Sequence, residues 1–511
     1  MSTSKRVVKN TFFLYMRTIV SLLLSVFTTR ILLEALGASD FGLYNVVGGS
    51  ISMLGFVSAS LSPVTQRFIS YAEGSGDKEK VIKYFNNSII IHNCLAICMV
   101  LVLSIAALFF FNGILNIPEG KYSAAMVIYI CMLVCAAFSI TVVPYEAEIN
   151  AHENMFFYAL MGIISVVLKF LIAVAVLYCS KDKLIFYAIL MALESFLTRY
   201  MAQWYCKYKY NECKKTALKD NFDKSIIKQI LSFTGWNLTN IATSMISLFG
   251  INIIVNHYFG TKVNAAMGIA TQVSGVMMGL SINMIKAVTP ILTKSEGGNQ
   301  HEKMLYISYV SCKFSFLIFA FACIPVLVFI NTILNIWLTV IPKWTELFCV
   351  ILITGTLIEQ LGFVLYHSIM AKGDIKLFNI CRSILNIIPF IATIIIFQKT
   401  DIAPYISFVL WAIFYSMLGC VVVNVIFAHI KLGFNIGAYV YRVIKPAIIT
   451  ALSAFIVDAF LYFVSFNSDI NRVFFLIFAV IVNIPIFWFA GLNCKERSIF
   501  LSFLSIGQKN K

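Results

Sequence analysis

Basic side chains inside long apolar segments are the residues of this sequence best suited to chemistry. Arg17 and Lys169 interrupt apolar runs at about residues 11–33 and 155–178, and Arg30 lies near the end of the first run. Within a bilayer each such charge costs about 2.5 to 3.5 kcal/mol on insertion scales, so each is a functional candidate. A guanidinium can bind a phosphate through two parallel hydrogen bonds, and we therefore expect these cations to bind an anionic ligand.

Each of these cations also has a structural alternative. Arg17 and Arg30 are 13 residues apart, which on a straight helix means about 20 Å along the axis and about 140° around it. On a straight helix, Arg17 and Arg30 therefore cannot both bind the same phosphate group. Arg30 can pair with Glu34 one turn on, whereas Arg17 can extend toward the membrane surface. Lys169 can form a buried pair with Glu194.

Amides and acids in other apolar runs extend the list of candidates. Asn45, Asn237 and Gln272 carry amides that can hydrogen-bond the hydroxyls of a sugar, or equally join one helix to another. Glu359 and Asp458 are deep acids. A carboxylate there can bind Na⁺ or H⁺ and couple transport to a gradient, and the alternative is a protonated acid hydrogen-bonded within its own bundle.

Composition identifies the elements that must position these residues. The chain has 511 residues, of which 60% are hydrophobic and 12% charged, whereas a soluble domain has about 25% charged residues. A bilayer core about 30 Å thick needs about 20 apolar residues per helix, and the sequence repeatedly supplies such runs. A β-barrel is excluded because its strands alternate over about ten residues. The sequence therefore predicts an all-α integral membrane protein.

Apolar runs bounded by charges or turn residues predict fourteen membrane spans. They are residues 11–33, 41–63, 87–112, 123–145, 155–178, 184–206, 229–255, 264–290, 308–334, 345–371, 377–397, 404–428, 444–465 and 472–492.

The distribution of positive charge predicts the orientation. With a cytoplasmic N-terminus, most of the 39 Lys and Arg residues fall in cytoplasmic loops, as the positive-inside rule requires. Both termini are then cytoplasmic. Contact with anionic lipid headgroups accounts for the net charge of +16, so we expect membrane lipids and no nucleic acid as partners.

Neither cofactor chemistry nor catalysis is predicted. The 13 Cys residues have no regular spacing, which argues against a disulfide framework and against a zinc or other metal site. The sequence contains no GxxxxGK[ST] phosphate-binding loop, and no polar stretch is long enough to fold as a catalytic domain. We expect a non-enzyme without a cofactor.

An internal repeat organises the spans. A gap-free shift of the chain along itself aligns Gly37 with Gly260 and Glu73 with Glu296. The first two spans thus resemble the seventh and eighth. Because these two pairs are offset by six spans, they have the same orientation in the membrane, and the symmetry axis lies along the membrane normal. The sequence therefore predicts two parallel-repeat six-helix lobes and two further helices. The expected boundaries are an N-terminal lobe, a basic cytoplasmic linker, a C-terminal lobe and a final segment with the last two helices, at residues 1–206, 207–228, 229–430 and 431–511.

The N-terminal segment identifies a family resemblance. Lys9-Asn-Thr, followed by Thr29-Arg-Ile-Leu-Leu-Glu-Ala-Leu-Gly-Ala-Ser-Asp-Phe-Gly-Leu-Tyr44, resembles the opening of polysaccharide-transport flippases of the O-antigen type. Their superfamily also holds multidrug and toxin extrusion antiporters and lipid II flippases. The resemblance implies a bacterial inner-membrane protein that moves undecaprenyl-diphosphate-linked oligosaccharide, such as an O-antigen unit of lipopolysaccharide, from the inner to the outer leaflet by alternating access.

Two other functions stay open. One is a cation-coupled multidrug antiporter of the same superfamily, although such antiporters usually have twelve spans and acidic cavities. The other is a membrane polysaccharide polymerase or ligase, although such enzymes usually carry a large external loop, and every predicted outward loop here is short. On the leading resemblance, Arg17, Arg30 and Lys169 are the candidates for binding the diphosphate.

Overall fold

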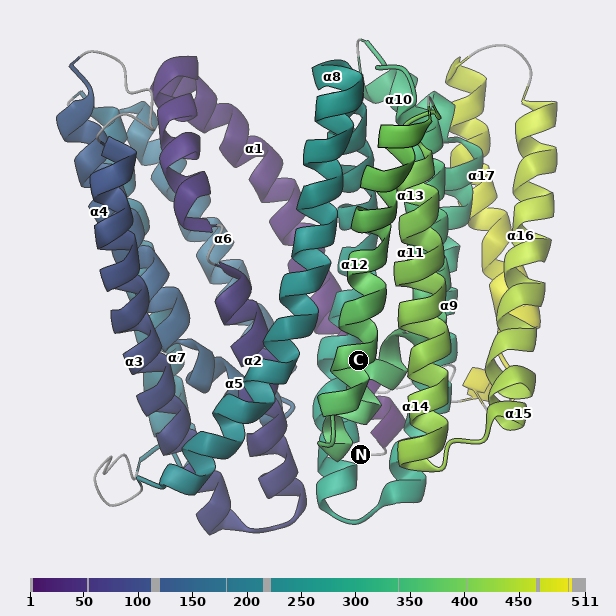
Figure 1. Cartoon of the computed structure of the whole chain (residues 1–511), viewed down its shortest axis with the longest axis horizontal. Coiled ribbons are helices and arrows are strands. Elements are labelled where there is room, and N and C mark those ends of the chain that lie inside the picture. The colour runs from purple at the N-terminus through teal and green to yellow at the C-terminus, as the bar shows by residue number, and fades with distance from the viewer. Residues whose placement is uncertain are drawn as a thin grey trace, which may run out of the picture. The chain divides into compact units, whose positions relative to one another are not determined.

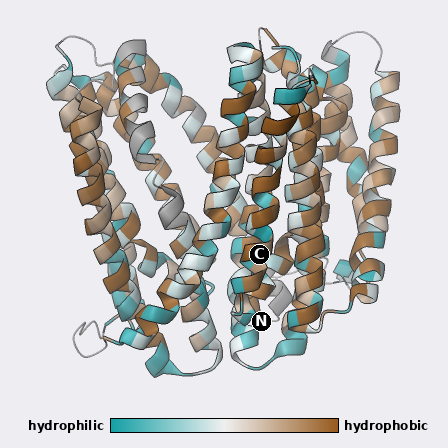
Figure 2. Ribbon diagram, viewed as in Figure 1, coloured by the Kyte–Doolittle hydropathy of each residue, from teal (hydrophilic) through white to brown (hydrophobic). Residues whose placement is uncertain are grey.

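The computed structural model describes residues 3–52, 55–111, 120–180, 182–214, 222–338, 340–400, 402–465, 469–494 and 496–498. These residues contain helices and no strand, which confirms the predicted all-α class. Twelve of the helical segments are long and apolar enough to cross a membrane. Figure 2 shows hydrophobic residues along the helices and hydrophilic residues at many of their ends, the pattern expected of bilayer-spanning helices.

The chain divides into two compact units. The N-terminal unit holds Lys9–Gly235, and the C-terminal unit holds Trp236–Lys511 with the first eight residues. The helices of the first part of the chain are α1 (Thr3–Ser52), α2 (Gly55–Gly74), α3 (Lys78–Phe109), α4 (Tyr122–Thr141), α5 (Val143–Ala151), α6 (Met155–Leu177) and α7 (Lys183–Lys209). The boundaries drawn from the sequence differ from this division and stay a prediction.

The helices of the second part begin with a very long one (Figure 1). They are α8 (Lys224–Gly297), α9 (His301–Val328), α10 (Ile330–Trp337), α11 (Thr345–Lys372), α12 (Lys376–Lys399), α13 (Ile406–Trp411), α14 (Val423–Leu432), α15 (Ile436–Tyr439), α16 (Lys445–Val464) and α17 (Asp469–Ile486). Three π-helical segments complete the set: η2 (Ala412–Val422), η3 (Val440–Ile444) and η4 (Phe487–Gly491).

Helix α8 contains two of the predicted spans. Its 74 residues would extend about 110 Å if straight, far more than the bilayer core of about 30 Å. The helical conformation breaks at Gly260, where φ is 77° and ψ is 179°, so the chain can turn back there. Part of the predicted span 41–63 lies outside the described residues. The count of fourteen therefore stays a prediction.

The predicted parallel repeat is confirmed by the backbone. Helix α1 breaks at Gly37 with φ of 74°, at the position that the repeat aligns with Gly260. A positive φ favours glycine, and no atom lies within 4 Å of a Cβ built at either residue, so the backbone conformation rather than packing requires glycine. Three further positive-φ positions recur at matching turns of the two lobes: Gly76 with Asn299, Gly120 with Trp344, and Glu153 with Gly373.

Helix α11 packs tightly against η2 and the start of α14. The amide of Asn424 donates to the Gly362 carbonyl at 2.9 Å, and a Cβ at Gly362 would lie 1.8 Å from the carbonyl oxygen of Cys420. A backbone atom cannot turn aside as a flexible side chain can. Helix α11 and η2 would have to separate to admit even one methyl group at Gly362.

We therefore expect Gly362→Ala to destabilise the C-terminal unit by about 2 kcal/mol, the usual cost of overpacking a core. The measurement is thermal unfolding of the purified protein in detergent. Gly268→Ala is the matched control, because Gly268 is helical and has open space around its Cβ. A Gly362→Ala protein that unfolds at the wild-type temperature would show that α11 and η2 can move apart freely.

Candidate functional site

Arg17 lies against helix α6 of its own unit. Its guanidinium carbon is 4.9 Å from the centre of the Tyr158 ring, a cation–π contact. A Cβ at Gly162 would come within 2.0 Å of its Nε, so the absence of a side chain at Gly162 makes room for Arg17. Among the described residues no carboxylate forms an ion pair with Arg17. The helix thus holds a positive charge without neutralising it.

Lys169 shares this face of α6. Tyr158, Gly162 and Lys169 are spaced so that they lie along one side of a helix, and seven residues place Lys169 about 10 Å beyond Gly162. Arg17 and Lys169 therefore lie along a common stripe, which we call the α6 cationic stripe. Extension to the membrane surface was the structural alternative for Arg17, whereas in the structure its side chain lies against Gly162 of α6.

The two ion pairs considered as structural alternatives do not form within the described part of the chain. Glu194 is buried, and it accepts hydrogen bonds from Ser165 at 2.6 Å and Thr198 at 3.1 Å instead of pairing with Lys169. Arg30 and Glu34 are both exposed, without a bond between them. Arg30 is not part of the α6 cationic stripe.

The candidate amides lie in different environments. Asn237 is buried and accepts a hydrogen bond of 2.7 Å from the Tyr366 hydroxyl, so it joins α8 to α11, as the structural alternative proposed. Gln272 is exposed on α8. The side chain of Asn45 lies outside the described residues.

Glu359 belongs to a buried polar cluster that also contains Arg382. Both side chains are about 6% exposed. The Arg382 guanidinium donates to Asn424 at 3.1 Å and to the Cys420 sulfur at 3.2 Å, and its carbon is 4.9 Å from the centre of the Tyr366 ring. Glu359 interacts with Arg382 through its charge without forming a direct ion pair.

Sequence reasoning missed Arg382 because it lies only five residues into the predicted span 377–397, where a basic residue is ordinarily an interface anchor. A signal was present. Asn379, Arg382 and Asn386 recur at helical spacing in α12, and all three are buried. Such a polar stripe inside an apolar helix indicates a buried network rather than an anchor.

Asp458 forms a separate contact. It is fully buried, and the Asn483 amide donates to its two carboxylate oxygens at 3.2 and 2.9 Å. This interaction joins α16 to α17, the two helices outside the repeat. The geometry favours the structural alternative for Asp458, and it does not bring Asp458 together with Glu359.

A cluster of three glutamates surrounds His152 at one end of the N-terminal unit. The imidazole nitrogens lie 2.6 Å from Glu212 and 3.2 Å from Glu73, and Glu148 is 3.3 Å away. Burial lowers the pKa of His152, but the hydrogen bonds to the carboxylates outweigh it and raise the pKa to about 11. The hydrogen bond from His152 lowers the pKa of Glu212 to about 2.

The atoms of Glu148, His152 and Glu212 are also close enough to hold a metal ion. Both nitrogens of His152 face carboxylates, however, which is the arrangement of an imidazolium donating two hydrogen bonds. The equivalent glutamate of the second lobe, Glu296, binds Lys372 at 2.9 Å, a cation that cannot ligate a metal while protonated. We therefore interpret both clusters as ion-pair hubs.

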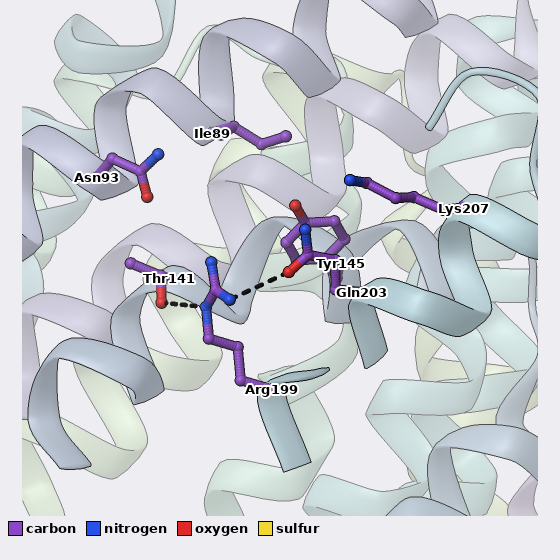
Figure 3. A pocket seen from close by; sticks show the side chains of 7 residues that line it. All are labelled: Ile89, Asn93, Thr141, Tyr145, Arg199, Gln203 and Lys207. Atoms are coloured by element: carbon purple, nitrogen blue, oxygen red, sulfur yellow. Dashed lines mark hydrogen bonds between the residues drawn. The ribbon is translucent and has the colours of Figure 1, made fainter. Parts of the chain in front are cut away.

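A pocket of about 210 Å³ lies between α3, α4, α5 and α7, near the end of the unit where α7 terminates. The side chains around it are mostly polar: Ile89, Asn93, Thr141, Tyr145, Arg199, Gln203 and Lys207. Arg199 donates from Nε to Thr141 at 2.8 Å and from Nη1 to Gln203 at 3.0 Å. Figure 3 shows Arg199 held between these two acceptors, with Asn93 and Lys207 facing the same space.

Comparison with known proteins gives three kinds of similarity. Residues 7–296, more than half of the chain, match the family described as polysaccharide biosynthesis protein. A stretch of 102 residues is 28% identical to the uncharacterized membrane protein EpsK of Bacillus subtilis, and it covers 20% of each chain.

Solved structures share the fold. The crystal structure of a MATE mutant aligns with a TM-score of 0.74 at 14% identity, over 85% of this chain and 97% of that one. An outward-facing multidrug resistance MATE family transporter aligns with a TM-score of 0.70 at 14% identity, over 85% and 96%.

Proposed function

Because the chain belongs to the polysaccharide biosynthesis protein family and has the fold of MATE transporters, we propose that it moves undecaprenyl-diphosphate-linked oligosaccharide from the inner to the outer leaflet by alternating access. On this proposal it is a bacterial inner-membrane transporter with both termini in the cytoplasm, and not an enzyme. O-antigen units of lipopolysaccharide represent the class of cargo.

The α6 cationic stripe is the observation that carries the choice of cargo. Arg17 and Lys169 are half-buried in membrane-spanning helices, and neither forms an ion pair with a carboxylate in the described part of the unit. Keeping such charges in a bilayer is costly unless they meet a ligand. A diphosphate supplies the missing negative charge, whereas a cationic drug would be repelled.

Deletion of the gene tests this function. An impermeant reagent modifies only the glycans on the outer leaflet of intact spheroplasts. Mass spectrometry of the extracted lipids then detects both the modified and the unmodified lipid-linked glycans. We expect complete single repeat units to accumulate in a pool protected from the reagent. Normal surface glycan with altered sensitivity to cationic drugs would favour the antiporter. Single units that are exposed but not extended would favour the polymerase or ligase.

We further propose that Glu359 binds the coupling ion, Na⁺ or H⁺. Its carboxylate is buried beside a fixed cation, Arg382. The affinity of Glu359 for Na⁺ or H⁺ therefore depends on how the surrounding helices are arranged, and it can change during alternating access. Glu359→Gln is expected to leave transport insensitive to the ion gradient. The measurement is transport into vesicles with and without each imposed gradient.

Asp458→Asn is the control for this prediction, because the Asn483 contact gives Asp458 a structural partner. Its transport is expected to keep the wild-type dependence on the gradient. If Glu359→Gln keeps that dependence and Asp458→Asn loses it, the two assignments must be exchanged.

A further inference from the structure

The pocket around Arg199 carries positive charge that the transport proposal does not use. Of the seven side chains around it, Arg199 and Lys207 are basic and none is acidic. Thr141 and Gln203, which accept from Arg199, are neutral. They fix the direction of the guanidinium without cancelling its charge, and some of its N–H groups have no partner among the described residues. The pocket is therefore preorganised for an anion.

The size and chemistry of the pocket fit a phosphate. Its volume of about 210 Å³ corresponds to roughly seven water molecules in the liquid, enough for a phosphate and part of its ester. Besides the two cations, Asn93 and Tyr145 provide neutral donors from α3 and α5. Donors from three helices thus converge on one space, whereas exposed lysines alone would give only a diffuse positive surface.

The surface next to the pocket is apolar and faces outward. Ile97 and Leu101 lie one and two turns beyond Asn93 on α3, and they are 62% and 59% exposed. On α7, Trp204 and Tyr208 flank Lys207 and are 57% and 71% exposed. Exposed aliphatic side chains that give way to exposed Trp and Tyr are typical of the boundary between lipid tails and headgroups.

We propose that this pocket binds the phosphate of an anionic phospholipid from the leaflet at the basic end of α7, with the acyl chains along Ile97 and Leu101. The lipid is a bound membrane component, separate from the transported cargo. Lys207 lies in the last turn of α7, where its charge strengthens the attraction for an anionic headgroup. The site fastens the α3, α5 and α7 ends of the N-terminal unit to one leaflet.

Native mass spectrometry of the full-length protein tests the proposal, with phosphatidylglycerol as the probe and phosphatidylcholine as the neutral comparison. We expect wild-type protein to retain phosphatidylglycerol preferentially. Lys207→Gln, a change at an exposed residue, is expected to weaken retention about tenfold, the equivalent of one charge-assisted hydrogen bond. The double variant Arg199→Gln, Lys207→Gln is expected to abolish the preference.

Lys209→Gln is the matched control, because Lys209 is also exposed in the last turn of α7 and does not line the pocket. Its preference for phosphatidylglycerol is expected to equal that of wild type. Equal binding of the two lipids by wild-type protein, or an unchanged preference in Lys207→Gln and the double variant, would overturn the proposal.

Two competitors identify the source of the phosphate. If inorganic phosphate displaces phosphatidylglycerol, the acyl chains contribute nothing and the assignment to a lipid is wrong. Undecaprenyl diphosphate is expected to bind the double variant as well as wild type. Loss of both lipids from the double variant would instead assign the pocket to the cargo and overturn a separate lipid site.

Discussion

Replacing Arg17 or Lys169 by alanine is expected to abolish transport of the lipid-linked oligosaccharide while normal amounts of protein remain in the membrane. Each cation provides charge-assisted hydrogen bonds of about 1.5 to 3 kcal/mol, so its loss weakens diphosphate binding roughly tenfold to a hundredfold. Within the described residues, neither side chain forms an ion pair that its removal would break. The measurement is restoration of surface polysaccharide in a deletion strain, with the protein quantified by immunoblot.

Two further variants separate charge from geometry at Arg17. Arg17→Lys keeps the charge but loses the planar fork, and it is expected to restore transport only in part. Gly162→Ala changes no charge, but its methyl group would collide with the Arg17 Nε and displace the guanidinium from α6. We expect impaired transport by a stable protein. Full activity of Gly162→Ala together with loss of protein in Arg17→Ala would indicate that Arg17 has only a structural role.

Removing the imidazole of His152 is expected to be the most destabilising single change in the N-terminal unit. His152→Ala would leave Glu148, which is fully buried, without its cation. Breaking a buried ion pair in this way costs about 3 to 5 kcal/mol. Thermal unfolding in detergent measures the effect. Adding Glu148→Gln removes the uncompensated charge and is expected to recover part of the loss, and no recovery would contradict this explanation.

The pH dependence of this contribution has a definite sign. The pKa of His152 is raised from 6.5 to about 11 in the folded protein, so its stabilisation is complete below about pH 6.5 and disappears as the pH rises through 11. The pKa of Glu212 is lowered from 4.5 to about 2, so its share is lost only as the pH falls toward 2. The difference in unfolding temperature between wild type and His152→Ala should therefore shrink above neutral pH. A constant difference up to pH 11 would contradict it.

The all-α membrane class and the internal repeat could be predicted from the sequence, because they follow from the length and spacing of the apolar runs. The alignment of Gly37 with Gly260 predicted a repeat, and the structure shows that both glycines break their helices with a positive φ, a conformation that only glycine adopts without strain. The alignment of Glu73 with Glu296 also paired two residues that have similar contacts in the structure. Each of these glutamates binds a cation near the end of a matching helix, His152 in one lobe and Lys372 in the other.

The partners of individual charged side chains were harder to predict from the sequence, because they depend on how each helix is rotated about its own axis. Lys169 and Glu194 have depths that suit an ion pair, yet Glu194 bonds to Ser165 and Thr198. A basic residue close to the end of a predicted span, such as Arg199, is ordinarily an interface anchor, whereas Arg199 lines a pocket. A span boundary fixes depth along the membrane normal to within a few residues, and it leaves the direction of each side chain around the helix open.

Reconstituted transport is the most direct test of the central claim. Purified protein is placed in liposomes with undecaprenyl-diphosphate-linked oligosaccharide, and an impermeant glycosidase then reports the share of glycan that faces outward. The account predicts that wild-type vesicles deliver the inner pool to the enzyme, whereas the Arg17→Ala, Lys169→Ala variant leaves that pool protected as in protein-free vesicles. An inner pool that stays protected in wild-type vesicles, while the same vesicles move a cationic drug against an ion gradient, would contradict it.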